Sequence, residues 1–494
     1  MVDFATLIGN FLSDLLVLKT FFALIVFFLA SDVAPAQHKT ELQFINRVST
    51  GRLQQTVRDL VNFGNRQGGT RSGDKAVKYL TKQFKTLGLK VEVLEDPERL
   101  TFTSDQWNVE VLQPAKFKGL LSHSWLAGFS PSAHRKSVRL ISVPANGDIS
   151  KIDVDSAAVL LDLNNANRLY KQLAEKGAVC LLTWAEAHSD AYANSAFIEN
   201  LSPSLDNPIP VFDISRNSAI SLTKTLDSKR TVLITFSSKT RILKGKSKTV
   251  VATLPGRSKN YYIVCAHGDS DSGGPGADDN ASGDSGVLEI ARILSGMNRN
   301  GMLPKPDSSI KFIIWGSEYS STEQYVKQHS TLLSNIVGVL NFDEIGTGAT
   351  RDCIYFEGND QRINYTMLKI LEKVGEDYAG KKSFWHEATT NPSQGGTDSY
   401  VFLPNYLSRL GVPVVEIPSI TVYTAAWQEP KSIFQPKEWR TKAWKGPEDS
   451  VIIDYSLYYH SSMDLPSTTT DKEPKNMVWG VRAVGIALLR LLWQ

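Results

Sequence analysis

The chain has 494 residues, 42% of them hydrophobic and 21% charged, a composition that argues against a disordered protein and leaves room for about two or three domains. A formal net charge of +3 is near balance for this length, so composition gives no reason to expect a nucleic-acid partner. The three cysteines, Cys180, Cys265 and Cys353, lie in apolar runs without a CxxC spacing. This favours buried free thiols over a disulfide or a metal site.

The first 36 residues have the pattern of a secretory signal peptide. Lys19 precedes the apolar run 21–30, and Ala34-x-Ala36 fits the small-residue pattern of a cleavage site. We therefore expect the protein to be secreted, either to the periplasm or to the extracellular space. The alternative is an uncleaved anchor that also uses the apolar stretch 12–18. Only in that case would the protein be attached to a membrane.

Two helices and a strand are predicted next, followed by a change of pattern. Apolar residues at helical spacing indicate helices near 53–61 and 76–84, and the run 89–94 alternates like a strand. Between residues 115 and 235 the chain shows many short strands with two interleaved helices, and it contains no cluster of metal-binding or nucleophilic residues. We interpret residues 115–235 as an inserted β-rich domain, with 37–114 and 236–494 forming the main domain.

From about residue 248 strands and helices alternate. Strands are predicted at 261–266, 310–316, 336–342, 353–356 and 412–417, and helices are predicted after Ser282, near 363–374 and at 477–493. This alternation is typical of a mostly parallel sheet with helices on both faces. The predicted fold class is therefore α/β, with a mostly parallel mixed sheet sandwiched by helices and a β-rich inserted domain.

Acidic residues and histidines follow the predicted strands. His267 and Asp279 come after the first strand of this region, Glu318 ends the second and Asp343 ends the third. His460 and Asp464 lie near the end of the chain. Because the carboxyl ends of parallel strands meet at one edge of a sheet, these groups are expected to converge there. Two imidazoles and several carboxylates describe a site for zinc or a similar divalent ion.

Six short segments carry a resemblance to a known family. They are AHGDS, PGADDNASG, FIIWGSE, LNFDEIG, GGTDS and YHSSMD, in that order. They resemble the successive motifs of the secreted zinc aminopeptidases, a family that includes aminopeptidase Y and glutamate carboxypeptidase. The insert resembles that family's protease-associated domain, most closely in LYKQLAEKGAVCLLTW and NPIPVFDIS.

The resemblance implies a role for each site residue. His267 and Asp343 would bind one zinc ion, Asp279 would bridge two, and His460 would bind the second. Asp269 would orient His267, since a ligating imidazole needs its other nitrogen held. Glu318 would be the general base that takes a proton from the metal-bound water.

One position departs from the family pattern, in which a pair of glutamates ends the strand of Glu318. Here Tyr319 follows Glu318. Tyrosine with a pKa near 10 is a poor zinc ligand, so we expect one firmly bound zinc ion and a second that is weak or absent. In a slipped alignment Glu318 would instead be the ligand, and Glu323 or Glu344 would be conceivable substitutes for the missing acid.

Two functions remain open from the sequence. The first is a secreted metal-dependent exopeptidase that acts on peptide substrates, most simply an aminopeptidase. The alternative is a binding protein on a catalytically impaired peptidase scaffold, which the Tyr319 substitution favours. A long aromatic segment at 420–450 is interpreted either as a lid or pocket wall or as a surface segment that packs on the inserted domain. Tyr458 or Tyr459 is a candidate donor to the oxyanion. The oligomeric state is left open.

Overall fold

The computed structural model describes residues 37–185, 193, 201, 206–270, 274–347, 353–358, 361–392, 397–424, 458 and 460–493. The predicted signal peptide lies outside the described residues, as do most of the predicted lid and Tyr459. Among the described residues, no helix combines the length and the apolar character that crossing a membrane requires.

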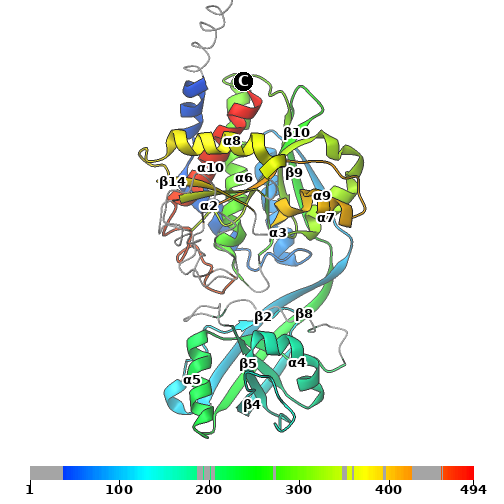
Figure 1. Cartoon of the computed structure of the whole chain (residues 1–494), viewed down its shortest axis with the longest axis vertical. Helices are drawn as coiled ribbons and strands as arrows, with labels where there is room; N and C mark the ends of the chain where they lie inside the picture. The colour runs from blue at the N-terminus through cyan, green and yellow to red at the C-terminus, as the bar shows by residue number, and fades with distance from the viewer. Residues whose placement is uncertain are drawn as a thin grey trace, which may run out of the picture.

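An eight-stranded sheet forms the centre of the main domain (Figure 1). In spatial order its strands are β1 (Lys90–Glu95), β9 (Lys248–Leu254), β11 (Ser309–Trp315), β10 (Tyr261–His267), β12 (Ile336–Phe342), β15 (Ser419–Tyr423), β13 (Cys353–Gly358) and β14 (Glu387–Pro392). Strands β11, β10, β12 and β15 run parallel to one another, and β13 and β14 run parallel to each other. Strand β9 pairs antiparallel with both β1 and β11, and β13 pairs antiparallel with β15. The sheet is mixed and mostly parallel, as predicted.

Apolar side chains alternate between the two faces of this sheet. In β10, Tyr262, Val264 and Ala266 join one buried cluster, while Ile263 and Cys265 join the cluster on the other face. The helices on the first face are α2 (Thr50–Val61), α3 (Arg71–Thr86), α6 (Gly283–Arg299), α8 (Gln361–Tyr378) and α10 (Lys475–Leu492). Those on the second face are α7 (Ser320–Gln328) and α9 (Pro404–Arg409). Helices therefore cover both faces, which confirms the predicted α/β class.

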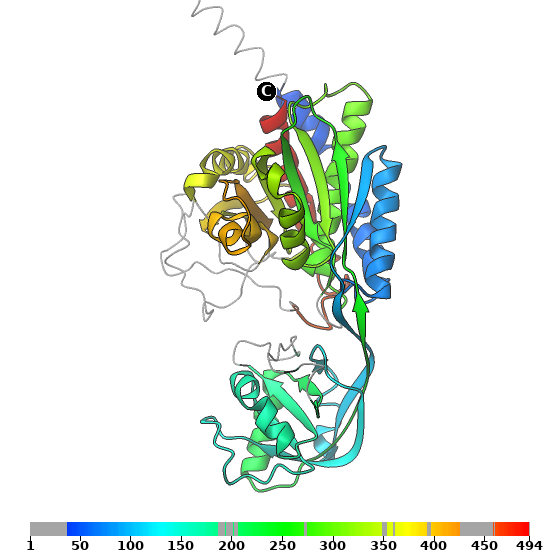
Figure 2. The same cartoon turned by 90° about the vertical axis from the view of Figure 1, so that its right-hand side faces the viewer.

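A second sheet builds the inserted domain (Figure 2). Its strands are β2 (Arg99–Gln113), β8 (Leu233–Gly245), β4 (Ala133–Ser142), β5 (Ala158–Asp162), β6 (Cys180–Trp184), β7 (Val211–Asp213) and β3 (Trp125–Leu126). Helices α4 (Leu163–Glu175) and α5 (Arg216–Asp227) pack against it, and a short 3-10 helix spans Ala115–Phe117.

This second sheet extends beyond the predicted insert of residues 115–235. Strands β2 and β8 pair along their length, from Arg99 opposite Gly245 to Gln113 opposite Leu233, and they form the link between the two domains (Figure 2). The sheet therefore begins near residue 99 and ends near residue 245. Leu100 and Leu243 are 48% and 40% exposed. Because apolar residues of β2 and β8 also lie on an exposed face, their spacing in the sequence does not show how long these two strands are.

The predicted strand at 412–417 is wrong. Those residues have no strand structure, and the strand of this region is β15, which begins at Ser419 and pairs with β12. Pro413 and Pro418 cannot donate a ladder hydrogen bond, so the apolar run between them cannot form a central strand of the sheet. Ile417 is nevertheless buried, in the cluster on the second face of the sheet.

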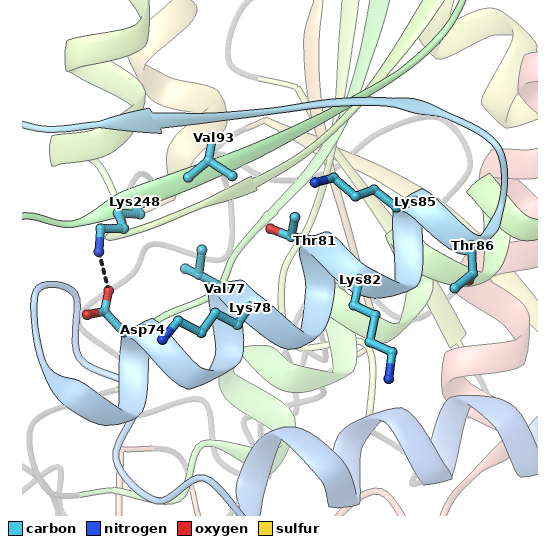
Figure 3. A pocket seen from close by; sticks show the side chains of 9 residues that line it. All are labelled: Asp74, Val77, Lys78, Thr81, Lys82, Lys85, Thr86, Val93 and Lys248. Carbon is cyan, nitrogen blue, oxygen red and sulfur yellow. Dashed lines mark hydrogen bonds and ion pairs between the residues drawn. The ribbon is translucent and has the colours of Figure 1, made fainter.

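The three cysteines are buried and free, as predicted. The structure also has a surface groove of about 640 Å³ between α3 and strands β1 and β9 (Figure 3). Val77 and Val93 contribute apolar surface to it, and Lys78, Lys82 and Lys85 line one side. None of the predicted site residues lines this groove.

Candidate metal centre

His267 is the last residue of β10, and Asp269 holds its ring. The Nδ1 atom of His267 lies 3.2 Å from Asp269 Oδ1 and 3.2 Å from the Asp269 backbone oxygen. The same Oδ1 atom accepts the backbone N–H of Glu318 over 2.9 Å. One carboxylate thus ties the end of β10 to the end of β11 and leaves Nε2 of His267 to face the rest of the site.

Three side chains bring one ligand atom each to a common point. His267 Nε2 lies 3.2 Å from Asp279 Oδ1 and 3.5 Å from Asp343 Oδ1, and the three atoms lie within 4.8 Å of one another. A tetrahedral zinc ion with bonds of about 2.0–2.1 Å would separate its ligand atoms by about 3.3–3.4 Å. The residues present therefore fit a zinc ion with one position left open.

The electrostatics of this group also favour a bound cation. Burial lowers the pKa of His267, but hydrogen bonds with Asp269, Asp279 and Asp343 raise it well above its usual value. Burial raises the pKa of Asp279, whereas its contacts with His267 and His460 bring it well below the usual range. Both shifts arise from the attraction between the imidazoles and the carboxylates around them, and a bound cation would satisfy the same carboxylates.

Asp279 also faces the second histidine. Its Oδ2 atom lies 2.8 Å from His460 Nε2, while Oδ1 faces His267. The two oxygens of one carboxylate thus point at two imidazoles, which is the arrangement that a bridging ligand needs. Among the described residues, however, the geometric set of three potential ligands forms only on the His267 side.

Backbone contacts hold the loop that carries Asp279. Asp464 accepts the N–H groups of Asp278 and Asp279 over 2.8 and 3.0 Å. The buried guanidinium of Arg66 donates to the backbone oxygens of Gly268, Pro275 and Gly276, over 3.2, 2.7 and 2.8 Å. Sequence reasoning missed the role of Arg66, because an arginine 200 residues away in the chain carries no local signal of these contacts.

Asp343 is oriented in a similar way. Its Oδ2 atom accepts the hydroxyl of Thr397 over 2.7 Å, which leaves Oδ1 to face His267. The neighbouring Asp398 is fully buried and accepts the N–H of Tyr319 over 2.9 Å and the hydroxyl of Thr322 over 2.5 Å. The GGTDS segment thus supports the centre instead of supplying a metal ligand.

Glu318 begins the turn after β11, where its N–H is fixed by Asp269. Burial raises the pKa of its carboxyl well above the usual value, partly offset by the charge of His267. A raised pKa makes a carboxylate a better proton acceptor. The role of Glu318 as general base stays a prediction.

Tyr319 lies beside an apolar cluster. It is in the left-handed region, with φ of 52°, and its side chain packs against the cluster on the second face of the sheet. Burial raises the pKa of its hydroxyl far above the usual value. The expected loss of a metal ligand at this position stays a prediction.

The two suggested substitutes for the missing acid differ. Glu323 accepts the hydroxyl of Tyr406 over 2.6 Å and is engaged on α7. Glu344 has a φ of 48°, so its backbone does not continue the extended conformation of β12. Its Oε1 atom is buried without a hydrogen-bond partner in the part of the chain that is described. Burial, followed by the charges of Asp279 and Asp278, raises the pKa of its carboxyl.

Comparisons with known proteins agree with this geometry. The family model described as peptidase family M28 matches residues 249–484, just under half of the chain, and this segment contains every predicted metal ligand. The match confirms the resemblance that the motifs predicted: residues 249–484 are similar to peptidase family M28. The likeness of the insert to a protease-associated domain stays a prediction.

Curated relatives are named as aminopeptidases. A probable lipoprotein aminopeptidase, LpqL, of Mycobacterium tuberculosis is 27% identical over 63% of this chain and 62% of its own length. An aminopeptidase of Pseudomonas aeruginosa is 24% identical over 60% of this chain and 56% of its own length, and aminopeptidase YwaD of Bacillus subtilis is 24% identical over 75% and 78%. The match thus spans less than two thirds of the first two relatives.

Solved structures share the fold. A peptidase M28 precursor from Shewanella amazonensis superposes with a TM-score of 0.63 at 18% identity, covering 92% of this chain and 96% of its own. The zinc aminopeptidase BSAP from Bacillus subtilis superposes with a TM-score of 0.58 at 19% identity, covering 90% and 95%. At these identities the likeness establishes the fold alone.

Proposed function

We propose that this protein is a metal-dependent aminopeptidase that removes N-terminal residues from peptides. The observation that carries the proposal is the set of His267, Asp279 and Asp343 with their ligand atoms converging, beside the buried carboxyl of Glu318. The names of the relatives support hydrolysis from the amino end.

Each residue of the candidate site has a defined part in the reaction. When bound, a zinc ion polarises the scissile carbonyl and acidifies water. Glu318 accepts the proton of the attacking water and later gives it to the leaving amine. Asp269 holds the ring of His267 and the backbone of Glu318 in place, because its Oδ1 contacts both. Asp279 and Asp343 hold the negative charge that the cation balances.

We expect one firmly bound zinc ion and a weak or absent second ion. Support comes from Tyr319, which packs against an apolar cluster and leaves the His460 side with fewer carboxylate ligands. The complete ligand set on the His267 side supports an enzyme over a binding protein on an impaired scaffold. The site of action proposed here is outside the cytoplasm, on the strength of the predicted signal peptide.

Hydrolysis assays can test this function directly. The zinc-loaded protein should cleave L-leucine p-nitroanilide and the tripeptide Leu-Gly-Gly, releasing leucine first. An N-acetylated Leu-Gly-Gly control should resist cleavage, since an aminopeptidase needs a free amino terminus. Cleavage of the acetylated peptide from its carboxyl end would show a carboxypeptidase, and absence of hydrolysis by fully loaded protein would favour the binding protein.

A further inference from the structure

A residue of the inserted domain reaches the metal centre. A small pocket beside the His460 side of the site is lined by Asp279, His460, Ser461 and Asp464 from the main domain and by Trp125 from the second sheet. Trp125 belongs to β3, where it pairs with Asp213 of β7. The wall of this pocket is therefore built from both domains.

The indole of Trp125 has an unused donor. The residue is 1% exposed, and its Nε1 atom is buried with no hydrogen-bond partner among the residues that the structure describes. A buried donor left unpaired costs free energy comparable to a lost hydrogen bond. The Nε1 atoms of Trp315 and Trp479 are also buried without a partner among the described residues, but of these three tryptophans Trp125 alone lines the pocket beside His460. An indole N–H donates only, so its natural partner is an acceptor oxygen.

A neighbouring tryptophan provides an internal comparison. The ring of Trp107 lies 6.2 Å from that of Trp125, centroid to centroid, at an interplanar angle of 53°. Its own Nε1 donates to the backbone oxygen of Ser124 over 3.1 Å. The indole N–H of Trp107 thus has a hydrogen-bond partner within its own domain. Trp125 instead lines a pocket together with Asp279 and His460.

The shape of the pocket suggests what occupies it. Its volume of about 10 Å³ has room for roughly one oxygen-sized group. A single carbonyl oxygen of a peptide bound at the centre fits this space and would accept the indole N–H.

We propose that Trp125 is a substrate-binding residue contributed by the inserted domain, whose indole N–H donates to a carbonyl oxygen of the peptide held at the metal centre. This inference rests on the proposed aminopeptidase function. It gives the inserted domain a part in recognition, since the main domain alone leaves the pocket without this wall.

The test compares Trp125→Phe with Trp107→Phe in the full zinc-loaded chain. Trp125→Phe keeps an aromatic ring but removes the donor, and we expect KM for Leu-Gly-Gly to rise about 3- to 10-fold while kcat stays within about 2-fold. Zinc content should not change. Trp107→Phe should keep the wild-type KM, and Trp125→Tyr, which retains a donor, should lie between. An unchanged KM in Trp125→Phe, or equal changes in both phenylalanine variants, would overturn the inference.

A second measurement needs no substitution. Amide hydrogen exchange of the wild-type protein should slow in the segment around residues 121–127 when saturating L-leucine, the expected product, is added. Unchanged exchange there, with slowed exchange around residues 274–283, would place the ligand in the main domain alone and reject a role for Trp125. Wild-type protein that binds zinc but hydrolyses no peptide would reject the aminopeptidase function itself, which is a different result from an active enzyme with an indifferent Trp125.

Discussion

Asp464 accepts the backbone N–H of Asp279 over 3.0 Å, so a residue near the carboxyl end of the chain fixes the carboxylate that faces both histidines. Its other oxygen accepts the N–H of Asp278 over 2.8 Å. Because Asp464 follows His460 by four residues, the same turn carries a histidine of the site and the support for its partner. The two halves of the centre are thereby held together by backbone contacts.

Replacing this carboxylate should weaken metal binding. In Asp464→Asn only the amide oxygen can accept, so one of the two N–H groups loses its partner and Asp279 is less well held. Losses of this kind typically cost about 10- to 100-fold in metal affinity, and we expect a decrease in this range by competition with a zinc chelator. Asp162→Asn, at a carboxylate that accepts the N–H of Asn165 in the other domain, is the matched control and should bind zinc normally.

Glu318→Gln should abolish hydrolysis while keeping the metal ion. The amide has nearly the same shape but cannot accept a proton, so we expect kcat to fall about 10²- to 10⁴-fold, the usual contribution of general base catalysis. Zinc content, measured by mass spectrometry, should remain that of the wild type. Glu323→Gln, on the neighbouring helix, should retain activity. Loss of zinc from Glu318→Gln would instead identify Glu318 as a ligand and support the slipped alignment.

Much of the centre could be predicted because strand ends are local features. His267, Asp279, Glu318 and Asp343 each follow an apolar run, and parallel strands bring such residues to one edge. The contacts that orient them are not local. Asp464 and Asp279 are 185 residues apart, and Thr397 lies 54 residues from Asp343. No periodicity in the sequence reports which backbone N–H a distant carboxylate will meet.

The limits of the inserted domain could not be predicted for a related reason. Strands β2 and β8 join the second sheet by pairing with each other across more than a hundred residues of intervening chain. Their exposed apolar residues, such as Leu100 and Leu243, resemble neither a buried strand nor a loop. The strand misplaced at 412–417 is a different case: Ile417 is buried, but Val414 is exposed, and Pro413 and Pro418 cannot donate ladder hydrogen bonds.

Tyr319→Glu should increase zinc content towards two ions per chain. The substitution supplies the carboxylate that the His460 side lacks, at a backbone position whose N–H is already fixed by Asp398. We expect the wild type to hold one ion after dialysis and the variant to hold more, with Tyr319→Phe unchanged as the control. Two tightly held ions in the wild type would contradict this account, and Glu344→Gln would then show whether Glu344 supplies the missing acid.

The buried carboxyl of Asp284 should make the free energy of unfolding depend on pH. Asp284 is fully buried at the start of α6, and neither oxygen has a hydrogen-bond partner within the described part of the chain. Burial raises its pKa from 3.8 to about 7, against the opposing charges of Arg66 and His267. Between these two values the folded state binds the proton more tightly than the unfolded state, so the free energy of unfolding falls as pH rises from about 4 to 7.

Asp284→Asn should remove this dependence, because the amide cannot ionise. In metal-free protein, where no bound cation adds its charge, we expect the variant to unfold at nearly the same temperature as the wild type at pH 4 to 5. At pH 8 it should unfold at a higher temperature, with a gain of at most about 4 kcal/mol for a shift of this size. Thermal unfolding followed by circular dichroism measures the difference. Asp307→Asn, at an exposed aspartate paired with Arg257, is the control. A variant less stable than the wild type at pH 8 would show that ionised Asp284 stabilises the fold by balancing the buried charge of Arg66.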